Sequence, residues 1–261
     1  MTERSVFKIS DGQIVATGLA RGPWDANAQH GGAPAALLAR AFERAVPAGD
    51  GLVFARLTYE LLRPVPLGPL DVHCELVRPG KRVQLLDGSI TTPDGVEVVR
   101  SRAVRVRAAD VDAGSVEPPP PGPAGCRPND FRRDELERFP TDGMEIVFVK
   151  GRFHEIGPAT AWFRLRTPLV ADEAPSGLQR LVAAADFPNG IASELPWGEY
   201  LFINPDLTVY VFREPVGEWI CLDARMTVAD GGVGFSEAIL FDERGRVGRS
   251  LQSLYVARQV T

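Results

Sequence analysis

The stretch that decides the fold is Val98-Val99-Arg100-Ser101-Arg102-Ala103-Val104, because a similar stretch returns later as Val247-Gly248-Arg249-Ser250-Leu251-Gln252-Ser253. Gln252 lies 149 residues after Ala103. Further upstream, Arg63-Pro64-Val65-Pro66-Leu67-Gly68 and Arg213-Glu214-Pro215-Val216-Gly217 each follow a hydrophobic run, at an offset of 150 residues. Recurrence of order and composition at one spacing indicates that a structural unit was duplicated.

Both halves show the same order of predicted elements. Residues 33–44 carry apolar side chains at helical spacing, with Pro34 in the first turn, where a missing amide costs nothing. Strands are predicted at 52–62, 70–77, 83–91 and 96–107, and the turns between them indicate an antiparallel meander. The second half repeats this with a helix near 176–186 and strands at 207–212, 219–228, 233–241 and 248–256.

A proline-rich segment separates the halves. The run 118–121 consists of four prolines, and Pro123 follows closely. Proline cannot pair inside a sheet and favours an extended spacer. We therefore expect an N-terminal unit at 1–108, a linker at 109–135 and a C-terminal unit at 136–261.

Composition excludes several classes of function. The 261 residues carry a net charge of −5 with no long basic run, which argues against a nucleic-acid partner. No apolar stretch of about 18 residues is present and the first residues lack a signal core, so we expect a cytoplasmic protein without membrane contact. Three cysteines without metal spacing and only three histidines make neither a metal site nor a disulfide the expectation.

Asp186 is the first candidate for chemistry. Leu178, Val182 and Asp186 are spaced by four residues each, which places a carboxylate on the apolar stripe of the second predicted helix. Burial would raise its pKa toward the range of a general base. The alternative is that the helix frays at Pro188-Asn189-Gly190 and leaves Asp186 in solvent.

Gln252 and Asn204 are the second and third candidates. Gln252 shares a strand face with small and apolar residues, and its amide can position a water molecule or form an ordinary cross-strand hydrogen bond. Ala103 stands at the corresponding place in the first half, and this difference between the copies favours a function. Asn204 precedes Pro205, a sequence that first of all indicates a turn.

The segment His30-Gly31-Gly32 lies just before the first predicted helix. Amides at a helix start point outward and glycine allows a ligand to approach, so an oxyanion hole can form there. The alternative is that the two glycines only allow a tight turn. Trp24 is expected to pack over this turn as wall or core.

Several motifs together carry a resemblance to a known family: Trp24, His30-Gly31-Gly32, Asp186, Asn204-Pro205-Asp206-Leu207-Thr208 and Arg249-Ser250-Leu251-Gln252-Ser253. In order and spacing the chain resembles the thioesterase-like superfamily related to the bacterial type II acyl-CoA thioesterases. The resemblance implies an α+β double hotdog fold, in which each of two tandem units wraps an antiparallel sheet around a helix.

The resemblance also implies a reaction. Asp186 would act as general base on a water held with Asn204 and Gln252, while His30, Gly31, Gly32 and Trp24 would bind the substrate or its oxyanion. The relatives usually carry a threonine or serine where this chain has Asn204. That departure supports an alternative from another class, a non-catalytic acyl or acyl-CoA binding protein.

A third possibility uses the same segment. Residues 25–30 resemble the Asp-x-Asn-Pro-x-His signature of hotdog enoyl-CoA hydratases, in which Asp25 and His30 would share acid and base work. Ala28 replaces the proline, and the Ser/Thr-Gly that precedes the signature is absent.

The expected activity is therefore hydrolysis of an acyl-CoA thioester in lipid metabolism, without a cofactor other than the coenzyme A of the substrate. No Gly-x-Ser-x-Gly elbow is present, so a covalent acyl-enzyme lacks an obvious nucleophile. We expect an apolar acyl channel between the halves, with Arg56, Arg63 and Arg213 as candidates for phosphate binding. Open sheet edges favour assembly into a homodimer.

Overall fold

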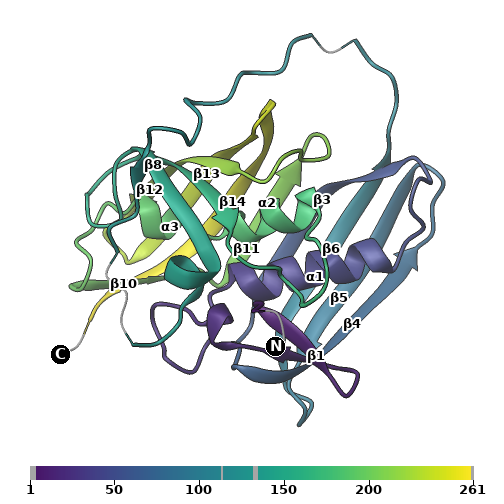
Figure 1. The fold of residues 1–261 in the computed structure, drawn as a ribbon, viewed down its shortest axis with the longest axis horizontal. Helices are drawn as coiled ribbons and strands as arrows, with labels where there is room; N and C mark the ends of the chain where they lie inside the picture. Colours follow the sequence, from purple (N-terminus) through teal and green to yellow (C-terminus); the bar gives the residue numbers. More distant parts are fainter. Residues whose placement is uncertain (1–3, 113, 132–134, 260–261) are drawn as a thin grey trace.

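The computed structural model describes residues 4–112, 114–131 and 135–259 (Figure 1). The first half contains β1 (Phe7–Ser10), β2 (Gln13–Ala16), α1 (Gly32–Arg44), β3 (Leu52–Leu61), β4 (Gly68–Arg78), β5 (Val83–Thr91) and β6 (Glu97–Arg107). The second half contains β7 (Arg127–Pro128), β8 (Met144–Lys150), β9 (Ala159–Leu165), α2 (Gly177–Ala185), α3 (Pro188–Ile191), β10 (Tyr200–Ile203), β11 (Asp206–Val211), β12 (Ile220–Val228), β13 (Val233–Asp242) and β14 (Gly245–Arg258).

One sheet runs through both halves. Its strand order is β1-β2-β4-β5-β6-β3-β11-β14-β13-β12-β9-β8-β7, and β10 pairs with β14 outside this path. The order from β3 to β1 mirrors the order from β11 to β8. Thr58 of β3 faces Thr208 of β11, and the two residues are 150 positions apart. The duplication predicted from the sequence is therefore a pseudo-twofold repeat about the β3–β11 junction, which is a double hotdog.

The predicted meander is wrong for its first strand. β4, β5 and β6 are consecutive neighbours, but β3 pairs with β6 on one side and with β11 on the other. In the second half β11 takes the same place beside β14. Moving β3 to this position gives both of its edges hydrogen-bond partners and joins the two units into one sheet, so neither unit leaves that edge open.

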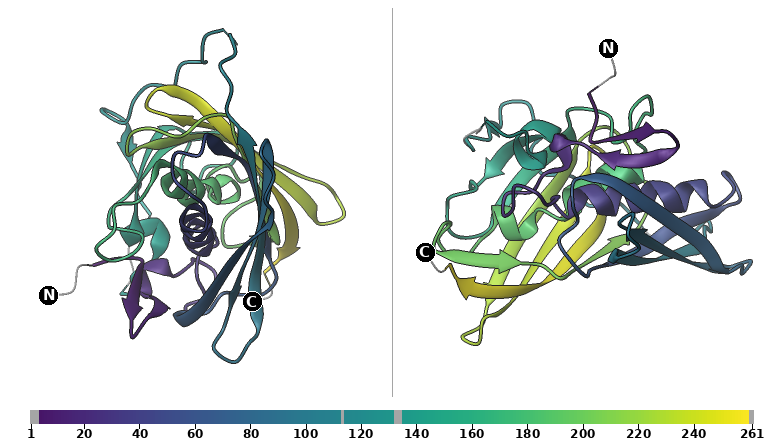
Figure 2. Two further views of the ribbon diagram at one scale, coloured as in Figure 1. Left: turned by 90° about the vertical axis from the view of Figure 1, so that its right-hand side faces the viewer. Right: turned by 90° about the horizontal axis from the view of Figure 1, so that it is seen from below.

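The two helices lie side by side inside the curve of the sheet (Figure 2, left). The predicted stripe of α1, which is Ala35, Leu38, Ala39 and Phe42, is buried. The apolar side of α2 is buried in the same core. Packing an apolar helical stripe against a concave sheet removes it from water, which is the main stabilising contribution in such a fold.

The segment between the halves runs over the second unit. It contributes the short edge strand β7, which pairs with β8, and the Pro121 carbonyl accepts a hydrogen bond of 2.7 Å from Trp162 Nε1. Its prolines stay outside the sheet interior, as their missing amide hydrogens require. Within the described residues, no helix combines the length and the apolar character needed to span a membrane.

Candidate active site

Asp186 is buried at the end of α2, with 4% of its surface exposed. Its Oδ1 accepts hydrogen bonds of 2.8 Å from Asn204 Nδ2 and of 2.8 Å from Gln252 Nε2. The alternative of a frayed helix end with a solvated carboxylate is wrong, because α3 continues the helical path over Pro188–Ile191 and keeps Asp186 in the core. Asp186, Asn204 and Gln252, which were expected to work together, are therefore joined by hydrogen bonds at one carboxylate oxygen.

The surroundings of Asp186 favour its protonated form. Burial raises the pKa of the carboxyl group from 3.8 to about 7, opposed by the hydrogen bonds from Asn204, the Gly32 amide and Gln252. Desolvation penalises the charged form, while donors to the carboxylate favour it. Near neutral pH both forms are populated, which is the condition for a general base that also returns its proton.

His30 faces the same carboxyl group from the start of α1. Its Nδ1 lies 3.2 Å from Asp186 Oδ2 and accepts a 3.1 Å hydrogen bond from the Gly32 amide. The ring stacks on Phe187 at 4.3 Å between centroids, and burial lowers the pKa of His30 to about 3. His30 is therefore neutral. Because its Nδ1 already accepts from the Gly32 amide, the contact between Nδ1 and Oδ2 brings two acceptors together when Asp186 is ionised.

Gly31 and Gly32 allow the two helices to approach at this point. A side-chain carbon on Gly31 would lie 2.7 Å from Asp186 Oδ2, and one on Gly32 would lie 2.5 Å from the Ala183 carbonyl oxygen. Such contacts are shorter than packing allows. At this helix start, the Gly32 amide donates to the His30 ring and the Ala33 amide to the His30 carbonyl, whereas the Gly31 amide has no acceptor among the described residues.

Two further polar residues support the site, and sequence reasoning missed both. Asn189 Nδ2 lies 3.4 Å from Asn204 Oδ1, and Ser236 Oγ donates a 2.7 Å hydrogen bond to Gln252 Oε1. Ser236 pairs directly with Gln252 across β13 and β14. The turn between the predicted strands 233–241 and 248–256 lies at Asp242–Gly245. Counting outward from it places Ser236 opposite Gln252 to within one residue, and the difference comes from a β-bulge that shifts the register between Leu240 and Phe241.

A cavity of about 560 Å³ opens beside the carboxylate. Its walls come from both halves of the chain, and they include His30, Gly31, Asp186 and Asn204. Trp24, 38% exposed, lines it and stacks on Trp197 with ring centroids 5.0 Å apart. Most of the remaining lining side chains are apolar, among them Leu61, Val65, Phe131, Phe153, Leu201 and Ile203. Of the two expected positions of Trp24, wall or core, the structure shows a wall of the cavity.

The three candidate phosphate ligands do not gather at this cavity. Arg63 lines it, but Arg56 and Arg213 do not. Arg213 binds the buried carboxylate of Asp242, with Nη2 to Oδ1 at 2.6 Å, so it stabilises the β13–β14 turn. Arg56 lies on β3 opposite Tyr210 of β11. Of the three candidates, Arg63 alone lines this cavity, because the strands carry the other two to separate places.

Asp25 lines the same cavity as His30. Its side chain is exposed and accepts a 2.8 Å hydrogen bond from the Asn27 amide within a local turn. The carboxyl group that approaches the His30 ring belongs to Asp186. No hydrogen bond or ion pair joins Asp25 to His30 among the described residues.

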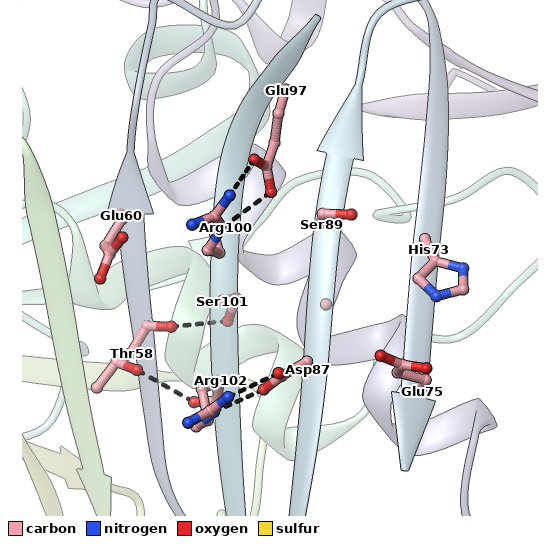
Figure 3. A pocket seen from close by; sticks show the side chains of 11 residues that line it. Thr58, Glu60, His73, Glu75, Asp87, Ser89, Glu97, Arg100, Ser101 and Arg102 are labelled. Atoms are coloured by element: carbon pink, nitrogen blue, oxygen red, sulfur yellow. Dashed lines mark hydrogen bonds and ion pairs between the residues drawn. The ribbon is translucent and has the colours of Figure 1, made fainter. Parts of the chain in front are cut away.

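A second, more open groove of about 430 Å³ lies across β3, β4, β5 and β6 (Figure 3). Arg102 pairs with Asp87 and Arg100 with Glu97, so both arginines of the groove are paired within the sheet. His73 and Glu75 of β4 border it. None of the predicted site residues lines this groove.

Two sequence models of one protein family match the chain. The model described as the acyl-CoA thioesterase N-terminal domain matches residues 20–106. The model described as the acyl-CoA thioesterase C-terminal domain matches residues 123–256. Asp186, Asn204 and Gln252 all lie within the second match, and His30-Gly31-Gly32 lies within the first. A search of curated proteins gives no match.

Solved structures share the fold over almost the whole chain. A conserved protein of unknown function with a hot dog fold from Alicyclobacillus acidocaldarius has a TM-score of 0.72 at 18% identity, covering 96% of both chains. An acyl-CoA thioesterase II, TesB2, from Mycobacterium marinum has a TM-score of 0.67 at 16% identity, covering 88% of this chain and 89% of the other. The tesB protein from Mycobacterium avium subs paratuberculosis has a TM-score of 0.65 at 14% identity, covering 94% and 93%.

Proposed function

Because the chain belongs to the acyl-CoA thioesterase family, we propose that it hydrolyses an acyl-CoA thioester by direct attack of water. The observation that carries this proposal is the buried carboxyl group of Asp186, which lines the cavity and receives amide hydrogen bonds on one of its two oxygens. The other oxygen, Oδ2, faces His30 and Gly31. A carboxylate fixed in this way has one oxygen available as a base.

In the first step the ionised Asp186 takes a proton from a water molecule, and the water oxygen forms a bond to the thioester carbonyl carbon. The carbonyl π electrons move to oxygen, which becomes an oxyanion. Gly31 N–H is the donor in place to stabilise it, and Asn204 holds the carboxylate at the cavity wall. Stabilisation of developing charge by a fixed donor is the larger part of catalysis in such reactions.

In the second step the oxyanion re-forms the carbonyl and the carbon–sulfur bond breaks. Sulfur leaves as a thiolate and receives the proton that Asp186 took from water, so the products are a carboxylic acid and free coenzyme A. A carboxyl group with a pKa of about 7 is suited to both transfers at neutral pH. Coenzyme A takes part as a piece of the substrate, so the reaction needs no further cofactor.

Gln252 has a different role in this proposal from the one that the sequence suggested. It does not line the cavity, and its amide nitrogen and oxygen are engaged by Asp186 and Ser236. It therefore orients the base from behind, and water contacts Asp186 and Asn204. The apolar walls receive the acyl chain between the halves, and Arg63 is the cation placed to meet the coenzyme A end.

The test is release of free thiol from a panel of acyl-CoA thioesters of increasing chain length. The wild-type protein is expected to turn over at least one of them, and Asp186→Asn to lower kcat/KM by at least a hundredfold. Asn keeps the shape and the hydrogen bonds of the protonated acid but cannot accept a proton from water. Turnover by Asp186→Asn equal to that of the wild type would contradict the mechanism.

A second candidate function is favoured by one residue. Asn204 stands where the resembled enzymes usually carry a hydroxyl, and both of its amide atoms have partners in the site. A protein that binds acyl-CoA in the cavity without hydrolysis would show saturable binding in calorimetry and no thiol release with any chain length.

A further inference from the structure

Ser236 and Gln252 form a buried polar pair behind the candidate base. Both residues have 0% of their surface exposed, and they are directly opposite each other on β13 and β14. Ser236 Oγ donates a 2.7 Å hydrogen bond to Gln252 Oε1, and Gln252 Nε2 donates a 2.8 Å hydrogen bond to Asp186 Oδ1. The three side chains thus form a chain of hydrogen bonds that ends on the carboxyl group.

The orientation of the Gln252 amide decides whether the carboxyl group of Asp186 faces a hydrogen-bond donor or an acceptor. With Nε2 toward the carboxyl group, the amide donates to it and favours its ionised form. With Oε1 toward the carboxyl group, two acceptors would face each other whenever Asp186 is ionised. The first orientation leaves Oε1 in a dry interior, where an acceptor without a donor is costly. The Ser236 hydroxyl supplies that donor.

The duplication provides an internal control for this pair. Gln252 lies 149 residues after Ala103, and Ser236 lies 150 residues after Leu86. Leu86 and Ala103 are opposite each other on β5 and β6, and both are buried and apolar. The fold is therefore satisfied by an apolar pair at this place. Only the unit that carries Asp186 has polar residues at both positions, and there they are bonded to each other.

We infer that Ser236 is a positioning residue of the site: its hydroxyl fixes the Gln252 amide so that Nε2 donates to Asp186 and favours the ionised base. This inference rests on the proposed function for its catalytic meaning. The hydrogen-bond chain itself has a consequence that does not depend on turnover. Without the serine hydroxyl, the Gln252 amide is held less firmly and its hydrogen bond to the ionised Asp186 is weaker. The pKa of Asp186 therefore shifts to a higher value.

The experiment compares Ser236→Ala with a matched control, Ser250→Ala. Ser250 is also fully buried, lies on β14 two residues from Gln252, and its Oγ has no hydrogen-bond partner in the described structure. The main measurement is the titration of the Asp186 carboxyl carbon by NMR in labelled full-length protein. The second is the pH dependence of kcat with the best acyl-CoA substrate.

We expect Ser236→Ala to raise the Asp186 midpoint by about half a pH unit to one pH unit. The acid limb of the kcat profile should move by the same amount, with kcat at pH 7 about two- to sixfold lower, because a smaller fraction of Asp186 is ionised, and with KM within about twofold. Ser236→Thr, which keeps the hydroxyl, should restore the midpoint. Ser250→Ala should leave it unchanged. In a Gln252→Ala background, Ser236→Ala should cause no further shift.

Three results would overturn the inference: an unchanged midpoint in Ser236→Ala, an equal shift in Ser250→Ala, or a full additional shift in the Gln252→Ala background. These results differ from failure of the proposed function. If Asp186→Asn keeps full turnover while Ser236→Ala still moves the titration, the proposed mechanism fails and the positioning role stands. If Asp186→Asn is inactive and the titration does not move, only the positioning role fails.

Discussion

The two ends of the helix pair show how a duplicated fold can give one site. Where α1 begins and α2 ends, Gly31 and Gly32 meet the carboxyl group of Asp186. Where α1 ends and α2 begins, Glu43 accepts hydrogen bonds from Ser176 Oγ at 2.9 Å and Gln179 Nε2 at 2.7 Å. Each end therefore has a carboxyl group held by an uncharged hydroxyl or amide.

Both carboxyl groups have a raised pKa, and burial is the largest cause in both. The two carboxyl groups differ in their access to a cavity and in the side chains that lie behind them. Asp186 lines the 560 Å³ cavity and is backed by Gln252 and Ser236, while Glu43 is not part of that cavity and bonds to the N-terminal turn of α2. A buried carboxylate alone is thus not a site; it also needs a cavity that brings substrate to it.

The largest expected difference between the two ends is in turnover. Asp186→Asn should lower kcat/KM by at least a hundredfold, which corresponds to about 2.7 kcal/mol of transition-state stabilisation. Glu43→Gln should keep kcat/KM within about twofold, because its hydrogen bonds serve the helix start. Thiol release assays on both variants check this. A comparable loss in Glu43→Gln would mean that both ends contribute to catalysis.

The next effect is the pH dependence of stability. The folded pKa of Asp186 is raised to about 7, so the folded state holds a proton that the unfolded state releases near pH 4. Asp186 therefore contributes a fall in stability of up to about 4 kcal/mol as pH rises from about 4 to about 7. Buried His30, whose pKa is lowered from 6.5 to about 3, contributes a rise of similar size between about pH 3 and 6.5, so the two nearly cancel in the wild type. Asp186→Asn should remove the fall and leave a stability that rises with pH. Urea unfolding between pH 4 and pH 8 measures this pH dependence, and an unchanged pH dependence in the variant would assign it to other groups.

A methyl group at Gly32 should not be tolerated, because the two helices approach each other closely there. Gly32→Ala would place a carbon 2.5 Å from the Ala183 carbonyl oxygen, and relief requires α1 and α2 to separate. We expect a loss of about 1–3 kcal/mol in unfolding free energy together with lower turnover. Gly122→Ala is the control, because nothing lies within 4 Å of its added carbon. Equal stability of the two variants would show that the approach is not constrained.

The smallest expected effect concerns the start of α2. Ser176 accepts a 3.1 Å hydrogen bond from the Gln179 amide as N-cap, whereas Gly31 at the start of α1 gives no side-chain cap. Ser176→Ala should cost about 1 kcal/mol and leave the Asp186 titration unchanged. Thermal unfolding and the NMR titration check both statements. A shift in the titration would mean that the two ends of the helix pair are coupled.

The sequence by itself predicted the fold and the central carboxylate. The repeat at about 150 residues and the turns between apolar strands are local patterns, so they could be read without knowing which strands pair. Helical spacing placed Asp186 on a buried stripe, and the structure confirms its burial. The difference between Ala103 and Gln252 indicated the half of the chain that carries the site.

Only the tertiary structure decided which groups meet. The position of β3 between β6 and β11, the contact of His30 with Asp186 and the support of Gln252 by Ser236 all join residues far apart in the sequence. The separation of Arg56, Arg63 and Arg213 has the same origin, because spacing along a chain does not fix distance across a sheet. Periodicity specifies which face of an element is buried, whereas strand register and helix packing specify what that face touches.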